Sequence, residues 1–180
     1  MYKAINKRHA LEIEKAIQFL VKSINESGHN DKPVILHSLQ IAFYLLENGY
    51  GENIVIGAIL HDVLEDTDID KNELASRFGN NIALLVQAVS YDQSIDDWEA
   101  RYKEMFTRVK SYGNDALILK CADILFNSLY IQRVKKREFE IKLVDKIEYF
   151  LKLSKDKIMN EKVWTDLDTQ YRIERDRLDK

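Results

Sequence analysis

The chain has 180 residues, of which 46% are apolar and 32% charged, enough to build one domain of ordinary size with a sizeable core. Its net charge of −3 argues against a dedicated nucleic-acid-binding protein, because such proteins usually carry a basic excess. The single cysteine excludes a disulfide framework and a cysteine-rich zinc site, and the absence of a signal core or a long apolar run predicts a cytoplasmic protein with no membrane segment.

Helices are predicted almost throughout, since the chain has one proline and six glycines, most of them near predicted helix ends. The first helix is predicted over residues 3–26, followed by a loop over residues 27–32. Pro33 suits the first turn of a second helix, which we expect to run to about Asn48 and to end at Gly49.

Residues 52–66 are apolar on nearly every side and lack the alternation of a half-buried strand, so they are predicted to form a core helix. Asp70 and Glu73 resemble a capping box for a short helix that ends at Gly79. Apolar residues at helical spacing predict the remaining helices over residues 82–89, 98–109, 117–129 (capped by Asn114 or Asp115), 138–158 and 161–177. The chain is therefore predicted to be all-α, a single helical-bundle domain over residues 1–180 whose core motifs lie at about 30–130 and whose C-terminal helices span 138–177.

Four polar residues stand in the predicted core helix: His61, Asp62, Glu65 and Asp66. Burying ionised carboxylates is costly unless a cation or hydrogen-bond donors compensate them. A metal ion offers that compensation. Adjacent residues of a continuous helix diverge by about 100°, so His61 and Asp62 can share one ion that lies between their directions.

Further ligands are expected from other helices. His37 lies among apolar residues of the preceding helix, and Asp123 lies in another largely apolar helix. Two histidines and two aspartates suit Mn²⁺, Fe²⁺ or Zn²⁺ and leave positions open for water and a phosphate oxygen. Glu65, one turn after His61, can act on the attacking water as general base or acid, and Asp66 can share that role.

Each of these residues also has an ordinary explanation. His37 can be a hydrogen-bonded core residue, Asp123 can pair with Lys120, and the Glu65-Asp66 pair can be a solvated helix end. A His-Asp dipeptide alone is weak evidence. The combination of a histidine, a His-Asp pair and a distant aspartate, each in an apolar helix, favours the metal site.

The pattern formed by His37, His61-Asp62 and Asp123 resembles the HD-domain metal-dependent phosphohydrolases. Over roughly residues 30–130, the segments HSLQIAFYLL, GAILHDVLEDTDID, RFGNNIALLVQAVS and LILKCADILFNSL are similar to the hydrolase domain of the bifunctional guanosine polyphosphate (ppGpp) synthetase/hydrolases and their small stand-alone relatives. The resemblance implies an all-α fold and one divalent ion, first of all Mn²⁺, with Fe²⁺, Zn²⁺ or Mg²⁺ as alternatives. It also implies hydrolysis of the 3′-pyrophosphate of guanosine tetra- or pentaphosphate.

The resemblance also implies roles for individual residues. It implies metal ligands at His37, His61, Asp62 and Asp123, water activation by Glu65 and Asp66, and a nucleotide contact at Asn127. Lys120, Arg101 and Lys103 are candidate phosphate contacts, with an ordinary surface cation as the alternative for each.

The chain departs from the family pattern on the substrate side. The family's arginine, tyrosine and lysine near the nucleotide are replaced by Asn25, Val34 and Ile124, and its Asp-Asp-Lys after the FG helix by residues 90–93. Two alternatives therefore stay beside the ppGpp hydrolase: a nucleoside 5′-monophosphate phosphatase and a non-catalytic nucleotide-binding sensor. The expected partner is a small phosphorylated nucleotide, and the sequence leaves a homodimer open.

Overall fold

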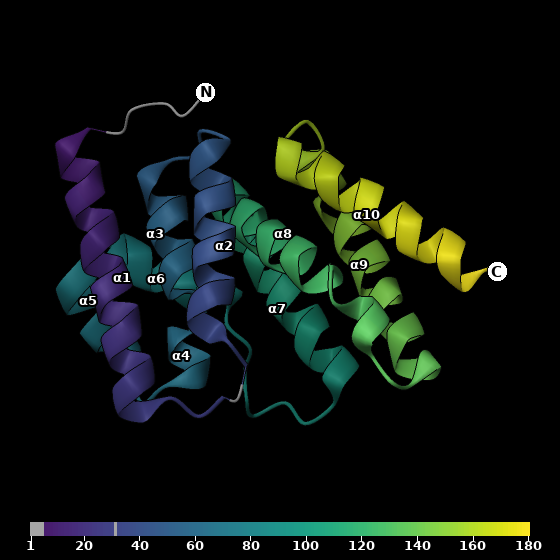
Figure 1. Cartoon of the computed structure of the whole chain (residues 1–180), viewed down its shortest axis with the longest axis horizontal. Coiled ribbons are helices and arrows are strands. Elements are labelled where there is room, and N and C mark those ends of the chain that lie inside the picture. The colour runs from purple at the N-terminus through teal and green to yellow at the C-terminus, as the bar shows by residue number, and fades with distance from the viewer. Residues whose placement is uncertain (1–5, 31) are drawn as a thin grey trace. The chain divides into compact units, whose positions relative to one another are not determined.

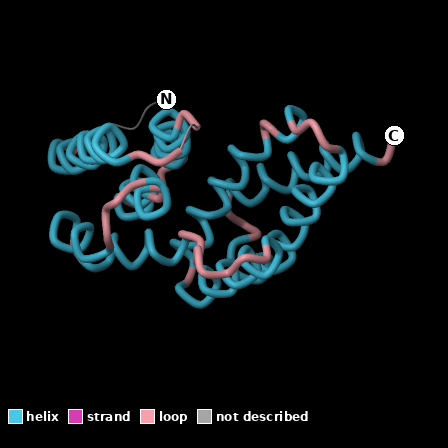
Figure 2. Tube along the Cα trace, turned by 90° about the horizontal axis from the view of Figure 1, so that it is seen from below, coloured by secondary structure: helices cyan, strands magenta, loops and turns pink. Residues whose placement is uncertain are grey.

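The computed structural model describes residues 6–30 and 32–180, and within these ranges all regular structure is helical (Figures 1 and 2). The predicted all-α class is confirmed. The chain divides into two compact units, the first extending to Ser94 and the second running from Ile95 to Lys180. The assignment of residues 1–180 to a single domain stays a prediction. None of the described helices is long and apolar enough to cross a membrane.

The first unit contains six helices within the described residues. They are α1 (Lys7–Ser27), α2 (Val34–Glu47), α3 (Glu52–Leu60), α4 (Val63–Asp66), α5 (Lys71–Phe78) and α6 (Asn80–Val89). Helix α3 is the centre of this unit, because every residue from Ile54 to Leu60 is buried. It contacts α1, α2 and α6, and Figure 1 shows it between α1 and α2. The prediction of a core helix here is confirmed for its first part.

The predicted continuous helix over residues 52–66 is wrong in its second part. Helix α3 ends at Leu60, residues His61 and Asp62 form a turn, and α4 begins at Val63. The Ala58 carbonyl, which in a continuous helix would accept from the amide four residues later, accepts a 2.7 Å hydrogen bond from the His61 ring. Asp62 has φ −94° and ψ −4°, in the sparsely populated bridge region where many active-site residues lie.

The other boundaries in this unit follow local chemistry. Helix α1 begins at Lys7 because the Asn6 side chain caps it, whereas the earlier start at residue 3 lies outside the described residues. The predicted Asp70 cap is confirmed by a 2.8 Å bond from the amide of Glu73. Gly49 and Gly79, the predicted helix ends, both have positive φ, which a glycine adopts at little cost.

The second unit contains α7 (Trp98–Tyr112), α8 (Asn114–Ser128), the short 3₁₀ helix η1 (Ile131–Arg133), α9 (Arg137–Ile158) and α10 (Lys162–Leu178). Helix α8 is its centre, with every residue from Ala116 to Leu125 buried, and it contacts α7, α9 and α10. The prediction that Asn114 or Asp115 caps α8 is wrong. Gly113 (φ 124°, ψ −166°) ends α7 and precedes Asn114, the first residue of α8, without a side-chain cap.

Candidate functional site

Two histidines from neighbouring helices lie together in the first unit. His37 of α2 and His61, which follows α3, have ring centroids 5.4 Å apart, and a ring nitrogen of one lies within 4.8 Å of a ring nitrogen of the other. His61 is buried and His37 half-buried. Because α2 packs against α3, the two predicted imidazole ligands from different helices do meet in the fold.

The His61 ring is held by the backbone. Its Nδ1 donates to the Ala58 carbonyl at 2.7 Å, so in the neutral ring the lone pair resides on Nε2. That Nε2 lies 3.1 Å from Asp62 Oδ1. A lone pair and a carboxylate oxygen repel each other at this distance unless a proton or a cation lies beside both. The arrangement fits a metal ion bound by both side chains, and a hydrogen bond donated by a histidine ring to a backbone carbonyl commonly orients a metal ligand.

The predicted acidic pair is held from two different loops. Glu65 Oε1 accepts a 2.8 Å hydrogen bond from the amide of Tyr91, and Asp66 Oδ1 accepts a 3.0 Å hydrogen bond from the Asn30 side chain. Burial raises the pKa of Asp66, the negative charge of Asp62 adds to the increase, and the Asn30 hydrogen bond opposes it. Carboxylates crowded in this way are stabilised by a nearby cation.

Sequence reasoning missed Asn30 and Tyr91 as supports of this site. Asn30 lies in the predicted loop, where the amide of His29 also donates to the Asp66 carbonyl at 2.9 Å. Tyr91 contributes its backbone amide, which any residue other than proline supplies, so no residue-type signal marked it.

Asp123 and Asn127 lie in the second unit, on α8. Asp123 is buried, its Oδ1 accepts a 2.6 Å hydrogen bond from Asn127 Nδ2, and its Oδ2 lies 2.8 Å from Lys120 Nζ. Asp123 and Asn127 therefore lie on one face of α8. The pairing with Lys120, one of the ordinary explanations for Asp123, also occurs, whereas the alternative that Lys120 is a surface cation is wrong because its side chain is buried.

The other candidate phosphate contacts have structural partners. Arg101 Nε donates to the Ile95 carbonyl at 2.5 Å, which fastens the loop before α7. Lys103 pairs with Glu99 at 2.5 Å and lies 5.4 Å from the centre of the Tyr149 ring. Arg101 and Lys103 thus each have a partner within the chain. Phosphate binding by either side chain stays a prediction.

The positions that depart from the family pattern differ in exposure. Asn25 is exposed on α1, whereas Val34 and Ile124 are buried. Aliphatic side chains at the latter two positions offer neither the hydroxyl nor the ammonium group that a tyrosine and a lysine would present.

The chain is similar to known proteins over the region that contains the two histidines. A family model described as HD domain matches residues 16–122, a range that includes His37, His61 and Asp62 and ends one residue before Asp123. The chain is 32% identical over 136 residues to a guanosine-3′,5′-bis(diphosphate) 3′-pyrophosphohydrolase of Aquifex aeolicus, covering 73% of this chain and 20% of that protein. It is 29% identical over 141 residues to guanosine-3′,5′-bis(diphosphate) 3′-pyrophosphohydrolase MESH1 of Danio rerio, covering 76% of this chain and 77% of that protein. The chain thus spans about a fifth of the Aquifex relative and about three quarters of MESH1.

Solved structures show the same fold. A metazoan ortholog of SpoT, described as hydrolysing ppGpp, matches with a TM-score of 0.78 at 19% identity, over 94% of this chain and 97% of that chain. The protein lmo0812 from Listeria monocytogenes matches with a TM-score of 0.64 at 20% identity, over 77% of this chain and 97% of that chain.

Proposed function

Because the chain belongs to the HD-domain family, we propose that it is a metal-dependent phosphohydrolase that removes the 3′-pyrophosphate of guanosine tetra- or pentaphosphate or a closely related nucleotide. The observation that carries the proposal is the His37–His61 pair, with the His61 ring tethered to Ala58 and its Nε2 beside Asp62. Relatives named 3′-pyrophosphohydrolases support the choice of substrate.

His37, His61, Asp62 and Asp123 are the proposed ligands of one divalent ion. The donor set of two imidazoles and two carboxylates suits Mn²⁺, with Fe²⁺, Zn²⁺ and Mg²⁺ as alternatives. Asp123 is included on the family pattern and as a buried carboxylate, whose present cationic partner is Lys120. When bound, such an ion offsets negative charge on the phosphoryl oxygens and lowers the pKa of a nearby water molecule.

The remaining residues act on the water and on the nucleotide. Glu65, held by the Tyr91 amide, is proposed to orient the attacking water, and Asp66 to accept its proton, a role that its raised pKa suits. The water oxygen bonds to the phosphorus next to the ribose 3′-oxygen, the 3′-oxygen–phosphorus bond breaks, and the 3′-oxygen takes a proton. The products are pyrophosphate and GDP or GTP. Asn127, Lys120 and Arg101 are proposed to contact the substrate.

The experiment is a pyrophosphate-release assay on the purified chain with ppGpp and Mn²⁺, together with measurement of bound metal. We expect turnover and about one equivalent of metal, both lost in Asp62→Ala and both retained in Asp176→Asn, an exposed aspartate of α10. Unchanged hydrolysis in Asp62→Ala, or a purified protein that binds no divalent metal, would refute the proposal.

A second candidate, a nucleoside 5′-monophosphate phosphatase, is favoured by Val34 and Ile124, the buried aliphatic residues at two substrate-side positions. A panel of nucleotides separates the two, because this enzyme releases orthophosphate. Nucleotide binding without turnover in Mn²⁺ would instead indicate a sensor. A cytoplasmic location completes the proposal, since the buried free thiol of Cys121 suits a reducing compartment.

A further inference from the structure

The outward face of α2 is apolar and exposed. Leu36 is 56% exposed and Phe43 is 45% exposed, and their spacing of seven residues places both on one side of the helix. Between Lys32 and Glu47 the sequence contains no Asp, Glu, Lys or Arg. Exposed apolar stripes of this kind on a soluble protein commonly mark a binding surface.

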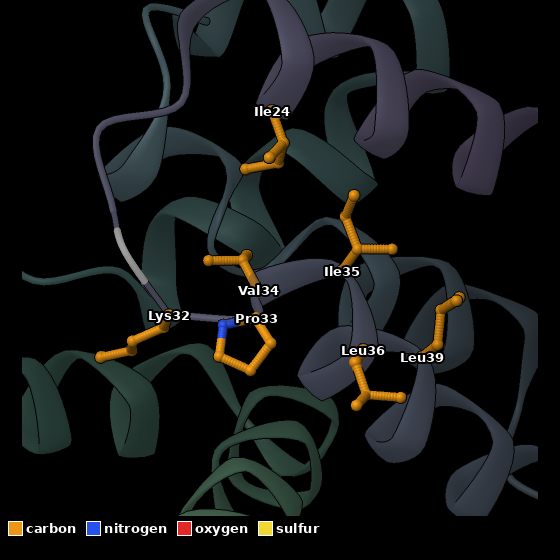
Figure 3. Close-up of a pocket in the computed structure, with 7 residues that line it drawn as sticks. All are labelled: Ile24, Lys32, Pro33, Val34, Ile35, Leu36 and Leu39. Carbon is orange, nitrogen blue, oxygen red and sulfur yellow. The ribbon is translucent and has the colours of Figure 1, made fainter.

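A groove lies beside this face at the N-terminal end of α2, on the side toward α1 (Figure 3). The groove has a volume of about 400 Å³, and Figure 3 shows Ile24 of α1 facing Val34 and Ile35 across it. Its lining is aliphatic apart from one charged side chain: Ile24, Lys32, Pro33, Val34, Ile35, Leu36 and Leu39. The groove thus borders the exposed face at Leu36 and Leu39, and the Phe43 ring projects from that face about 10 Å beyond Leu36 along the helix.

We propose that this face binds a second copy of the chain, with the two α2 helices antiparallel about a two-fold axis near Leu39 and Gln40. Residues at equal distances from that axis face each other in such a pair. Phe43 of each copy then lies opposite Leu36 of the other, at the edge of the partner's groove. A two-fold interface requires this self-complementarity, in which Leu36 and Phe43 of each copy contact Phe43 and Leu36 of the other.

The charged residues at the two ends of the face favour the antiparallel orientation of the two α2 helices. The exposed Lys32 and Glu47 lie at opposite ends of the face, at nearly equal distances from the Leu39–Gln40 midpoint. The antiparallel pair brings Lys32 of each copy to Glu47 of the other, giving two ion pairs at the rim, whereas a parallel pair would oppose like charges. His37 lies about 100° around the helix from Leu36 and so lies off the pairing face. A single helix pair is a small interface, so we expect dissociation in about the micromolar range.

The first test is the molar mass of the full chain by analytical ultracentrifugation over a range of concentrations. We expect a monomer–dimer equilibrium that Leu36→Glu and Phe43→Glu each weaken about tenfold or more, because each buries a charge in the apolar contact. The matched control is Leu11→Glu on α1, where a leucine is equally exposed (54%) outside this face. Circular dichroism checks that each variant folds. A wild type that stays monomeric at about 100 μM, or equal weakening by Leu11→Glu, overturns the proposal.

The second test exchanges the charges. Lys32→Glu and Glu47→Lys should each weaken the dimer, and the double variant should restore it, because every opposed pair again carries opposite charges. Failure of the double variant to recover overturns the antiparallel arrangement. Lys32 also lowers the pKa of Asp66, so the readout is molar mass rather than activity.

A crosslinking test places the axis. Leu39→Cys should form a disulfide between copies under mild oxidation, whereas Leu11→Cys should not, and the native Cys121 is buried and gives little background. Crosslinking of both variants to the same extent counts against the proposed axis.

Discussion

Glu65 and Tyr91, 26 positions apart in the sequence, are joined by a 2.8 Å hydrogen bond from the backbone amide of Tyr91 to Glu65 Oε1. The bond fixes the orientation of a carboxylate that follows the His61-Asp62 turn. Because the donor is a backbone group, its position depends on the end of α6 and the residues after it rather than on a side-chain rotamer.

Glu65→Gln tests the role of that carboxylate. The amide oxygen can still accept from Tyr91, but the negative charge is lost, so we expect kcat for nucleotide hydrolysis to fall by about 10²- to 10⁴-fold. The melting temperature and the bound metal should change little. Glu14→Gln, an exposed position on α1, is the control and should retain full activity. Retention of wild-type kcat by Glu65→Gln would remove Glu65 from the mechanism.

Asp66 makes a pH-dependent contribution to the stability of the metal-free chain. Its pKa is raised in the folded state, mainly by burial, so the unfolded chain holds the ionised form more favourably and the carboxylate destabilises the fold at neutral pH. This cost disappears as the pH falls through the folded pKa toward the unfolded value of about 3.9. Asp66→Asn should therefore be more stable than wild type at pH 7 in EDTA, with the difference vanishing at low pH. Urea denaturation from pH 7 downward measures it, and a difference that grows as the pH falls has the wrong sign.

Gly113 joins α7 to α8 with φ 124° and ψ −166°, a conformation that essentially only glycine adopts. Gly113→Ala should cost about 1–3 kcal/mol of the free energy of unfolding, purely from backbone strain, because an added Cβ would meet no atom within 4 Å. Gly51→Ala is the matched control, since Gly51 has equally open space but φ −66°. It should be close to neutral. Equal losses at both positions would show that φ is not the cause.

Glu174 of α10 is 1% exposed and is held by three donors: Gln132 at 3.1 Å, Gln170 at 3.0 Å and Arg177 at 2.9 Å. Arg177 also pairs with the buried Glu140 of α9. Glu174→Ala removes the acceptor of Gln132 and Gln170 and leaves Arg177 with Glu140 alone, so we expect a loss of about 2–4 kcal/mol in the free energy of unfolding. Glu138→Ala, at an exposed position of α9, should change it by less than about 0.5 kcal/mol. A loss below 1 kcal/mol for Glu174→Ala would mean that the network contributes little.

Most of the helices could be predicted from the sequence because their signals are local. The spacing of apolar residues in α6, the Asp70 cap and the glycine at the end of α2 each depend on residues within a few positions. The interruption of the predicted helix over residues 52–66 could not be foreseen in the same way. Apolar patterning continues across it, and the break coincides with one side-chain-to-backbone bond, from His61 to Ala58.

The residues of the candidate site also differ in whether a local sequence signal identifies them. Its chemical groups are side chains whose type reveals them, such as His37, His61 and Asp62. Its supports are not revealed in this way, since Asn30 reaches Asp66 across 36 positions and Tyr91 offers only an amide. Contacts of that range follow from tertiary packing rather than from any local pattern.

The buried pair of Lys120 and Asp123 bears on whether the chain must bind a metal before it can fold. A carboxylate buried alone would oppose folding until a metal arrived, but the lysine already balances its charge. If the proposed metal binds, the chain can fold before the metal arrives, and protein purified in EDTA should keep the helical circular dichroism of the metal-bound form. On the proposed ligand set, metal binding at Asp123 would replace its contact with Lys120 and would leave the ammonium group of Lys120 available to a phosphate.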